Sequence, residues 1–117
     1  MSMQQLSLFP DEEPHYPGWV YYALGPDCSV KIGYTTRPLR NRMYELGSAL
    51  ILASPGGPID ERRHLRMWRP CRVGTSEWHW PSVEMLEWLI RESLRRMNDL
   101  SPALLHLVHE HEVAAAA

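Results

Sequence analysis

The sequence predicts an α+β domain in which a small antiparallel sheet of about three strands is flanked by helices. Two apolar, aromatic-rich segments, Trp19–Leu24 and Ser29–Tyr34, lie on either side of the turn residues Gly25-Pro26-Asp27, which is the pattern of a β-hairpin. After this hairpin, segments with helix start and stop signals alternate with short apolar segments. The length of 117 residues suits one domain with a modest core.

The elements after the hairpin are predicted from their boundary residues. Pro38 suits the first turn of a helix and Gly47 suits its end, so a helix is expected over Pro38–Leu46. Pro70 ends a second helix, and Ser82 is a favourable N-cap for a third. The other expected elements are a strand at Leu50–Ala53, a helix at Ile59–Trp68, a turn and short strand within Val73–Trp80, a helix at Val83–Met97 and a helix from Pro102.

Composition divides the chain into three parts. Residues 1–17 are polar and acidic and contain three prolines, which predicts a flexible tail. Residues 18–98 hold the predicted sheet and its helices. Residues 99–117 add a C-terminal helix whose last four residues are alanines with nothing to pack against, so this end is expected to fray.

The composition argues against a membrane protein. No apolar segment approaches the roughly 20 residues of a membrane-spanning helix, and the N-terminus lacks the basic and apolar regions of a signal peptide. We therefore expect a cytoplasmic protein. Cys28 and Cys71 are too few and too far apart for a CxxC metal or redox site, so reduced thiols are expected.

The formal net charge of −2 hides an uneven distribution. Residues 18–82 carry nine basic and five acidic residues, whereas each flanking segment has an excess of three acidic residues. A basic middle between acidic ends is either a phosphate-binding surface or a solvated arginine-rich face. If it binds nucleic acid, the arginines expected to contact the phosphates are Arg37, Arg40, Arg63 and Arg66.

Helical periodicity singles out two charged residues. Arg42 lies at the border of the apolar face of the first predicted helix, from where it can reach into a cleft or extend along the surface. Glu61 shares the apolar stripe of the second helix with Leu65 and Trp68. A carboxylate on a buried face is costly unless it is paired or bound to a metal ion. Glu61 is therefore either a ligand of a hard cation such as Mg²⁺ or a member of a core ion pair.

Two further clusters each allow two interpretations. In the segment Glu77-Trp78-His79-Trp80, strand alternation predicts that both indoles are buried against the long helix, and the alternative is that they stack on nucleic-acid bases. On the C-terminal helix, His106, His109 and Glu110 share a face, followed by His111 and Glu112. This cluster either binds a metal ion or consists of solvated histidines.

Several of these features occur in a fixed order along the chain. Val20-Tyr21 is followed by Lys31-Ile32-Gly33, then by Arg42 and then by Glu61, and in this order the residues resemble the GIY-YIG nuclease superfamily. The likeness is closer to a phage- and bacteria-associated branch, whose further motifs are matched by Val30–Thr35, by Glu61 with His64, and by Glu77-Trp78. The resemblance covers about residues 18–90.

The resemblance implies a metal-dependent endonuclease that hydrolyses DNA phosphodiester bonds in repair, recombination, or phage and mobile-element biology. By analogy, Tyr21 lies near the attacking water, Arg42 stabilises the phosphate, and Glu61 binds Mg²⁺ or Mn²⁺. The alternative is a non-catalytic DNA-binding or clamp-docking module on a similar fold. A third interpretation is a likeness of fold alone, with Glu61 in a core ion pair.

The chain departs from the family pattern at two places. The first motif is Trp19-Val20-Tyr21 in place of Gly-Ile-Tyr, which is a tolerable apolar change. The second has Lys31 where the family name has a tyrosine, which removes a phenol from the site. Proton transfer must then fall to Tyr21, Lys31, Tyr34 or His64, of which histidine has the most suitable intrinsic pKa.

The N-terminal tail contains a second resemblance. Gln5-Leu6-Ser7-Leu8-Phe9 is similar to the short peptide by which bacterial DNA enzymes dock on the replicative sliding clamp. An amide anchor followed by apolar side chains suits a hydrophobic groove, and the alternative is a tail that packs on its own domain. The residues expected to contact the clamp are Gln5, Leu6, Leu8 and Phe9.

Overall fold

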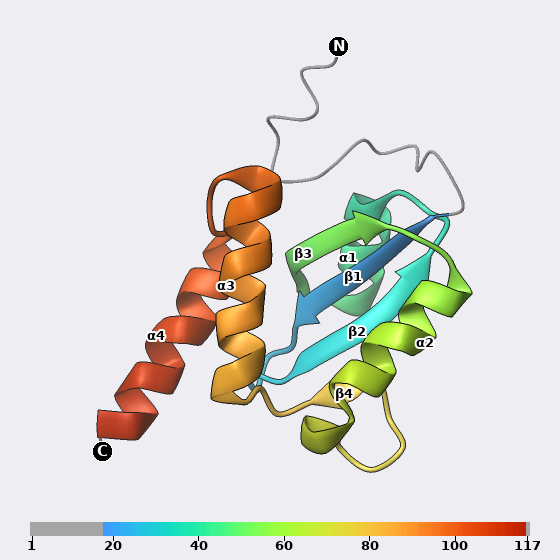
Figure 1. The fold of residues 1–117 in the computed structure, drawn as a ribbon. Helices are drawn as coiled ribbons and strands as arrows, with labels where there is room; N and C mark the ends of the chain where they lie inside the picture. The colour runs from blue at the N-terminus through green and yellow to red at the C-terminus, as the bar shows by residue number, and fades with distance from the viewer. Residues whose placement is uncertain (1–17, 117) are drawn as a thin grey trace.

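The structure, a computed structural model, describes residues 18–116 and has the expected α+β architecture (Figure 1). Its strands are β1 (Trp19–Leu24), β2 (Val30–Thr35), β3 (Ala49–Pro55) and β4 (Trp78–His79). Its helices are α1 (Leu39–Leu46), α2 (Pro58–Met67), α3 (Val83–Met97) and α4 (Pro102–Ala116), with a 3₁₀ helix, η2, at Arg69–Cys71. The predicted class, an antiparallel sheet flanked by helices, is confirmed.

The sheet has four strands in the order β3-β1-β2-β4, and each neighbouring pair is antiparallel. The sheet has one strand more than the expected number of about three, because the short strand predicted within Val73–Trp80 joins it as β4 and pairs with Val30 and Lys31 at the start of β2. In the central hairpin, Tyr21 lies opposite Gly33. The rest of β2 leaves an edge against which α2 packs (Figure 1).

Helices cover both faces of the sheet. On one face, Trp19, Tyr21 and Ala23 of β1 form a small core with Leu39 and Met43 of α1. On the other face, the larger core joins alternate sheet residues to α3 and α4 (Figure 1). Its central members are Val20, Tyr22, Ile32, Met85, Leu89, Leu104 and Leu107. Because strand side chains alternate between faces, the adjacent residues Tyr21 and Tyr22 belong to different cores.

Element boundaries shift by a few residues from their predicted positions. Pro38 precedes α1 in an extended conformation instead of occupying its first turn, and Gly47 ends the helix at φ 62° as expected. Ser82 caps α3 through a hydrogen bond that its Oγ accepts from Met85 N. Ser101 Oγ accepts from Leu104 N at the start of α4, which continues as a helix to Ala116.

The prediction that Trp78 and Trp80 are both buried was wrong. Trp78 is half-buried, Trp80 is 54% exposed, and His79 between them is fully buried. His79 Nδ1 lies 3.3 Å from the carbonyl oxygen of Val30, which gives this polar side chain a partner inside the core. Strand alternation was the right principle, but it places the histidine on the inner face. In the described part of the chain, no helix is long and apolar enough to cross a membrane.

Candidate functional site

The first half of the candidate site joins β1 to α1. Tyr21 and Gly33 face each other across the central hairpin, and the Tyr21 ring lies directly over the glycine. Arg42 Nε donates a hydrogen bond to the Tyr21 hydroxyl at 3.3 Å. This hydrogen bond raises the pKa of Arg42, so the guanidinium is charged at any working pH. The border position predicted for Arg42 thus brings it over the sheet face that carries Tyr21.

The second half joins β2, the segment before β4, and α2. Lys31 Nζ donates to Glu77 Oε1 at 2.6 Å and lies 5.8 Å from the centre of the Trp78 ring. A backbone hydrogen bond from Ile32 N to the Glu77 carbonyl fixes the position of Glu77 beside β2. The Asp60 carboxylate accepts a hydrogen bond from Gly57 N and so caps the start of α2. Glu61 is the next residue in the first turn of this helix.

The carboxyl groups of Glu61 and Glu77 meet in a hydrogen bond. Burial, followed by the charge of Glu77 and this hydrogen bond, raises the pKa of Glu61 above its ordinary value. Burial alone would also raise the pKa of Glu77, but the hydrogen bond and charge of Lys31 outweigh it, and the net shift is downward. Two carboxyl groups in contact whose pKa values move apart are typical of functional sites.

The two halves form one continuous group on the α1 side of the sheet. Lys31 alternates with Ile32 along β2, so it leaves the strand on the same face as Gly33 and Tyr21. Among the causes that lower the pKa of Glu77, the charge of Arg42 is the smallest, after the contributions of Lys31 and Glu61. The Arg42 side chain is 33% exposed and the Glu77 side chain 43% exposed, whereas Tyr21 is fully buried beneath them.

His64 does not join this group, although it was a candidate for proton transfer. It follows Glu61 by three residues on α2, but its ring is buried on the other side of the sheet edge. The Tyr22 hydroxyl forms a hydrogen bond with His64 Nδ1 at 2.6 Å and accepts one from Trp68 Nε1 at 3.1 Å. Burial, with the charge of Arg63, lowers the pKa of His64, which favours a neutral ring inside a hydrogen-bonded chain.

Tyr34 also lies apart from the group of side chains that contains Tyr21 and Arg42. It follows Gly33 in β2 and therefore leaves the strand on the opposite face, where its ring lies against Gly18. Lys31 belongs to the site, but its ammonium group is engaged with Glu77. Of the four candidates for proton transfer, Tyr21 is the one whose hydroxyl lies beside Arg42 on this face.

The arginines predicted to contact DNA lie on the outer surfaces of α1 and α2 and of the turn before α1. All four are exposed, and neighbouring acids partly neutralise Arg37 and Arg63. Arg37 pairs with Glu45 at 2.6 Å, and Arg63 pairs with Asp60 at 2.9 Å. Exposed ion pairs of this kind are weak, so phosphates could displace the acids.

Glu77 is the site residue that the sequence analysis did not assign. Its signal was present, because Glu77-Trp78 matched a family motif and because a lone acid precedes a short aromatic strand. The segment offers no helical face, however, from which its neighbours could be predicted. The clamp-binding residues Gln5, Leu6, Leu8 and Phe9 lie outside the described residues, as does the rest of 1–17.

The donor set fits a single hard divalent cation. Two adjacent carboxyl groups supply oxygen ligands, which Mg²⁺ and Mn²⁺ prefer. Lys31 already neutralises Glu77, so Glu61 is the carboxylate best suited to bind the ion, with Glu77 beside it. A bound cation would favour the ionised form of both carboxyl groups.

Comparisons with known proteins give no match. No protein-family model, no curated protein and no solved structure matched this chain.

Proposed function

We propose that this protein is a metal-dependent endonuclease of the GIY-YIG type that hydrolyses phosphodiester bonds in DNA. The observation that carries the proposal is the contact between the Glu61 and Glu77 carboxyl groups, next to Lys31 and on the sheet face of Tyr21 and Arg42. Four of these five residues occupy positions that the sequence resemblance singled out. The fifth, Glu77, belongs to a motif of the same resemblance.

Each residue has a distinct part in this proposal. Arg42 is exposed enough to meet a phosphate, and its planar guanidinium can donate two hydrogen bonds to phosphate oxygens. Tyr21 holds that guanidinium in place through its hydroxyl. Tyr21 is fully buried, so its hydroxyl is screened from solvent beneath Arg42.

Glu61, with Glu77 beside it, would hold Mg²⁺ or Mn²⁺. A bound ion supplies Lewis-acid stabilisation to the scissile phosphate and to the leaving oxygen. Lys31 keeps Glu77 ionised and oriented toward Glu61, so it acts as a positioning residue. In this arrangement the lysine found in place of the family tyrosine takes an electrostatic part and leaves the phenol chemistry to Tyr21.

The test is cleavage of supercoiled plasmid and of a branched DNA in Mg²⁺ or Mn²⁺. Wild-type protein should nick or cut in the presence of metal, and Glu61→Gln should lower the rate by about 100-fold or more while the fold is kept. Glu87→Gln is the matched control, because Glu87 is an exposed glutamate on α3. A folded wild type that cleaves neither DNA with either metal would overturn the nuclease proposal.

A second candidate is a DNA-binding module without catalysis, and two observations favour it. Tyr21 is fully buried, and Lys31 is already paired with Glu77. Such a module would bind duplex or branched DNA through its exposed arginines with a strong salt dependence. It would show no cleavage, and Glu61→Gln would leave its DNA affinity unchanged or slightly stronger.

The tail supports a further proposal about location. We propose that residues 5–9 dock the protein on the bacterial sliding clamp, on the strength of the sequence resemblance alone. A peptide of residues 1–17 should bind purified clamp, and the full chain should bind through the same site. Leu8→Ala together with Phe9→Ala should abolish binding of both, and unchanged binding would rule the proposal out.

A further inference from the structure

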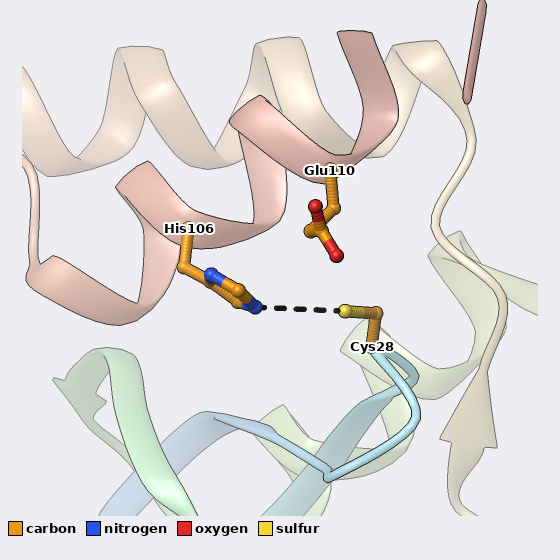
Figure 2. Close-up of side chains that lie close together, drawn as sticks. All are labelled: Cys28, His106 and Glu110. Carbon is orange, nitrogen blue, oxygen red and sulfur yellow. Dashed lines mark hydrogen bonds between the residues drawn. The ribbon is translucent and has the colours of Figure 1, made fainter. Parts of the chain in front are cut away.

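A second group of metal-ligating side chains lies away from the Glu61 site. Cys28 in the turn between β1 and β2 faces His106 and Glu110 of α4 (Figure 2). Their ligand atoms all lie within 4.8 Å of one another. Cys28 Sγ is 3.9 Å from His106 Nε2, and the Glu110 carboxyl group points toward the same space (Figure 2).

Local structure brings these three residues together. The hairpin turn closes through hydrogen bonds from Gly25 N to the Ser29 carbonyl and from Cys28 N to the Gly25 carbonyl. His106 and Glu110 are four residues apart on α4, so they project from one helix face. Ser101 fixes the start of that helix, because its Oγ donates to the Ile51 carbonyl and accepts from Leu104 N.

We propose that Cys28, His106 and Glu110 form a binding site for Zn²⁺. The three donors are a sulfur, an imidazole nitrogen and a carboxylate oxygen, which zinc accepts together and which Mg²⁺ does not favour. The thiol binds as a thiolate, and its proton passes to solvent. In a tetrahedral zinc site the ligand atoms are about 3.5 Å apart, so the sulfur and nitrogen need to approach by a few tenths of an ångström.

The side chains of the proposed site border a solvent-accessible hollow. A shallow hollow of about 210 Å³ adjoins the site and is lined by Cys28, Trp80, Pro81, Leu107, Glu110 and His111. Water can reach the metal from this side and complete the tetrahedron. Because Cys28 belongs to the hairpin and His106 to α4, bound zinc would tie the C-terminal helix to the sheet.

This site is independent of the proposed nuclease site. α4 packs on the face of the sheet that holds Tyr22, whereas Glu61 and Glu77 belong to the group with Tyr21 on the α1 side. The sequence analysis noted that His106, His109 and Glu110 share a helix face. Among the described residues, the group that the structure brings together replaces His109 with Cys28.

The experiment titrates the full metal-free chain with Co²⁺ and follows its absorption. Wild-type protein should bind one equivalent with a thiolate-to-cobalt charge-transfer band and the d–d bands of a tetrahedral ion, and Zn²⁺ should displace the cobalt. Cys28→Ser should lose the charge-transfer band, and Cys71→Ser, which alters the other cysteine, should keep it. His106→Ala should weaken binding, and His109→Ala is the matched control on the same helix.

Zinc should also raise the melting temperature of the wild type and of Glu61→Gln equally, because the two sites are separate. Absence of the charge-transfer band in folded wild-type protein would overturn the proposal. So would a band that persists in Cys28→Ser, or one that His106→Ala and His109→Ala weaken alike. None of these readouts depends on cleavage of DNA, so the zinc proposal can be refuted without affecting the nuclease proposal.

Discussion

Lys31 Nζ lies 2.6 Å from Glu77 Oε1, and the same carboxyl group is hydrogen-bonded to that of Glu61. The lysine side chain is only 11% exposed, so Glu77 is its partner in a largely buried position. One ammonium group and two carboxyl groups therefore form a chain in which Lys31 lowers the pKa of Glu77 and burial beside Glu77 raises the pKa of Glu61. This relationship makes the role of Glu77 testable.

The first prediction concerns removal of the Glu77 charge. Glu77→Gln leaves the buried ammonium of Lys31 without its carboxylate and should cost about 1–3 kcal/mol of unfolding free energy. It should also raise the Mg²⁺ concentration required for cleavage, because one oxygen ligand beside Glu61 loses its charge. Chemical denaturation and a metal titration of the nicking rate measure the two effects.

The control is a double-mutant cycle with Lys31→Met. If Lys31 and Glu77 stabilise each other, the double variant should be more stable than the sum of the two single changes predicts, by about 0.5–3 kcal/mol. Additive losses would mean that the pair seen in the structure has no energetic coupling.

The second prediction uses the two adjacent tyrosines as controls for each other. Tyr21→Phe removes the acceptor of Arg42 Nε and should lower cleavage at least about tenfold with little loss of stability. Tyr22→Phe removes the hydroxyl between Trp68 Nε1 and His64 Nδ1 and should cost about 1–3 kcal/mol without lowering the cleavage rate at a temperature where it stays folded. Equal effects of the two changes on cleavage would contradict the assignment of the site to the Tyr21 face.

The sequence predicted the class of fold because its signals are local. The hairpin follows from two apolar segments around Gly25-Pro26-Asp27, and Ser82 and Gly47 mark helix ends as their chemistry requires. β4 was harder to place because a two-residue strand has no periodicity of its own, and its position depends on pairing with Val30 and Lys31. The buried His79 was missed for the same reason, since a short strand does not indicate which face is inside.

The candidate site was predictable in part. Tyr21, Arg42 and Glu61 could be selected from strand and helix patterns together with the family resemblance. The sequence could not show that His64 lies outside the site. Whether Glu61 or His64 faces the Tyr21 side of the sheet depends on how α2 is rotated against β2. Glu77 and the Cys28–His106 contact join segments 46 and 78 residues apart, and such long-range contacts leave no spacing that a single sequence can show.

The third prediction concerns the glycine beneath Tyr21. A methyl group at Gly33 would collide with the Tyr21 hydroxyl and ring, so Gly33→Ala should cost about 2 kcal/mol and displace the tyrosine. The rate of cleavage should fall as well, because the Tyr21 hydroxyl that accepts the hydrogen bond from Arg42 Nε would be displaced. Gly47→Ala is an informative comparison, since its methyl group would meet nothing within 4 Å and its cost would come only from the φ of 62°. If Gly33→Ala is as stable and as active as the wild type, the close approach of Tyr21 to β2 is wrong.

The fourth prediction is a loss of stability as the pH falls below about 6.5, the ordinary pKa of histidine. Burial lowers the pKa values of both His64 and His79 in the folded protein. Above pH 6.5 the two rings are neutral in both states and the pH has no effect through them. Below pH 6.5 these histidines bind protons in the unfolded chain, whereas in the folded protein their lowered pKa values keep them neutral. Each ring therefore lowers the unfolding free energy by up to about 1.4 kcal/mol per pH unit, until the pH reaches the pKa of that histidine in the folded protein.

His64→Gln isolates one of these contributions, because the glutamine amide can donate or accept and can still hydrogen-bond to the Tyr22 hydroxyl. Urea denaturation between pH 7.5 and 5 should show a smaller loss for His64→Gln than for the wild type. The raised pKa of Glu61 acts in the opposite sense, but it is common to both proteins and cancels in the comparison. His109→Ala, at an exposed position, should keep the wild-type slope. An unchanged slope in His64→Gln would show that His64 is not held neutral by the core.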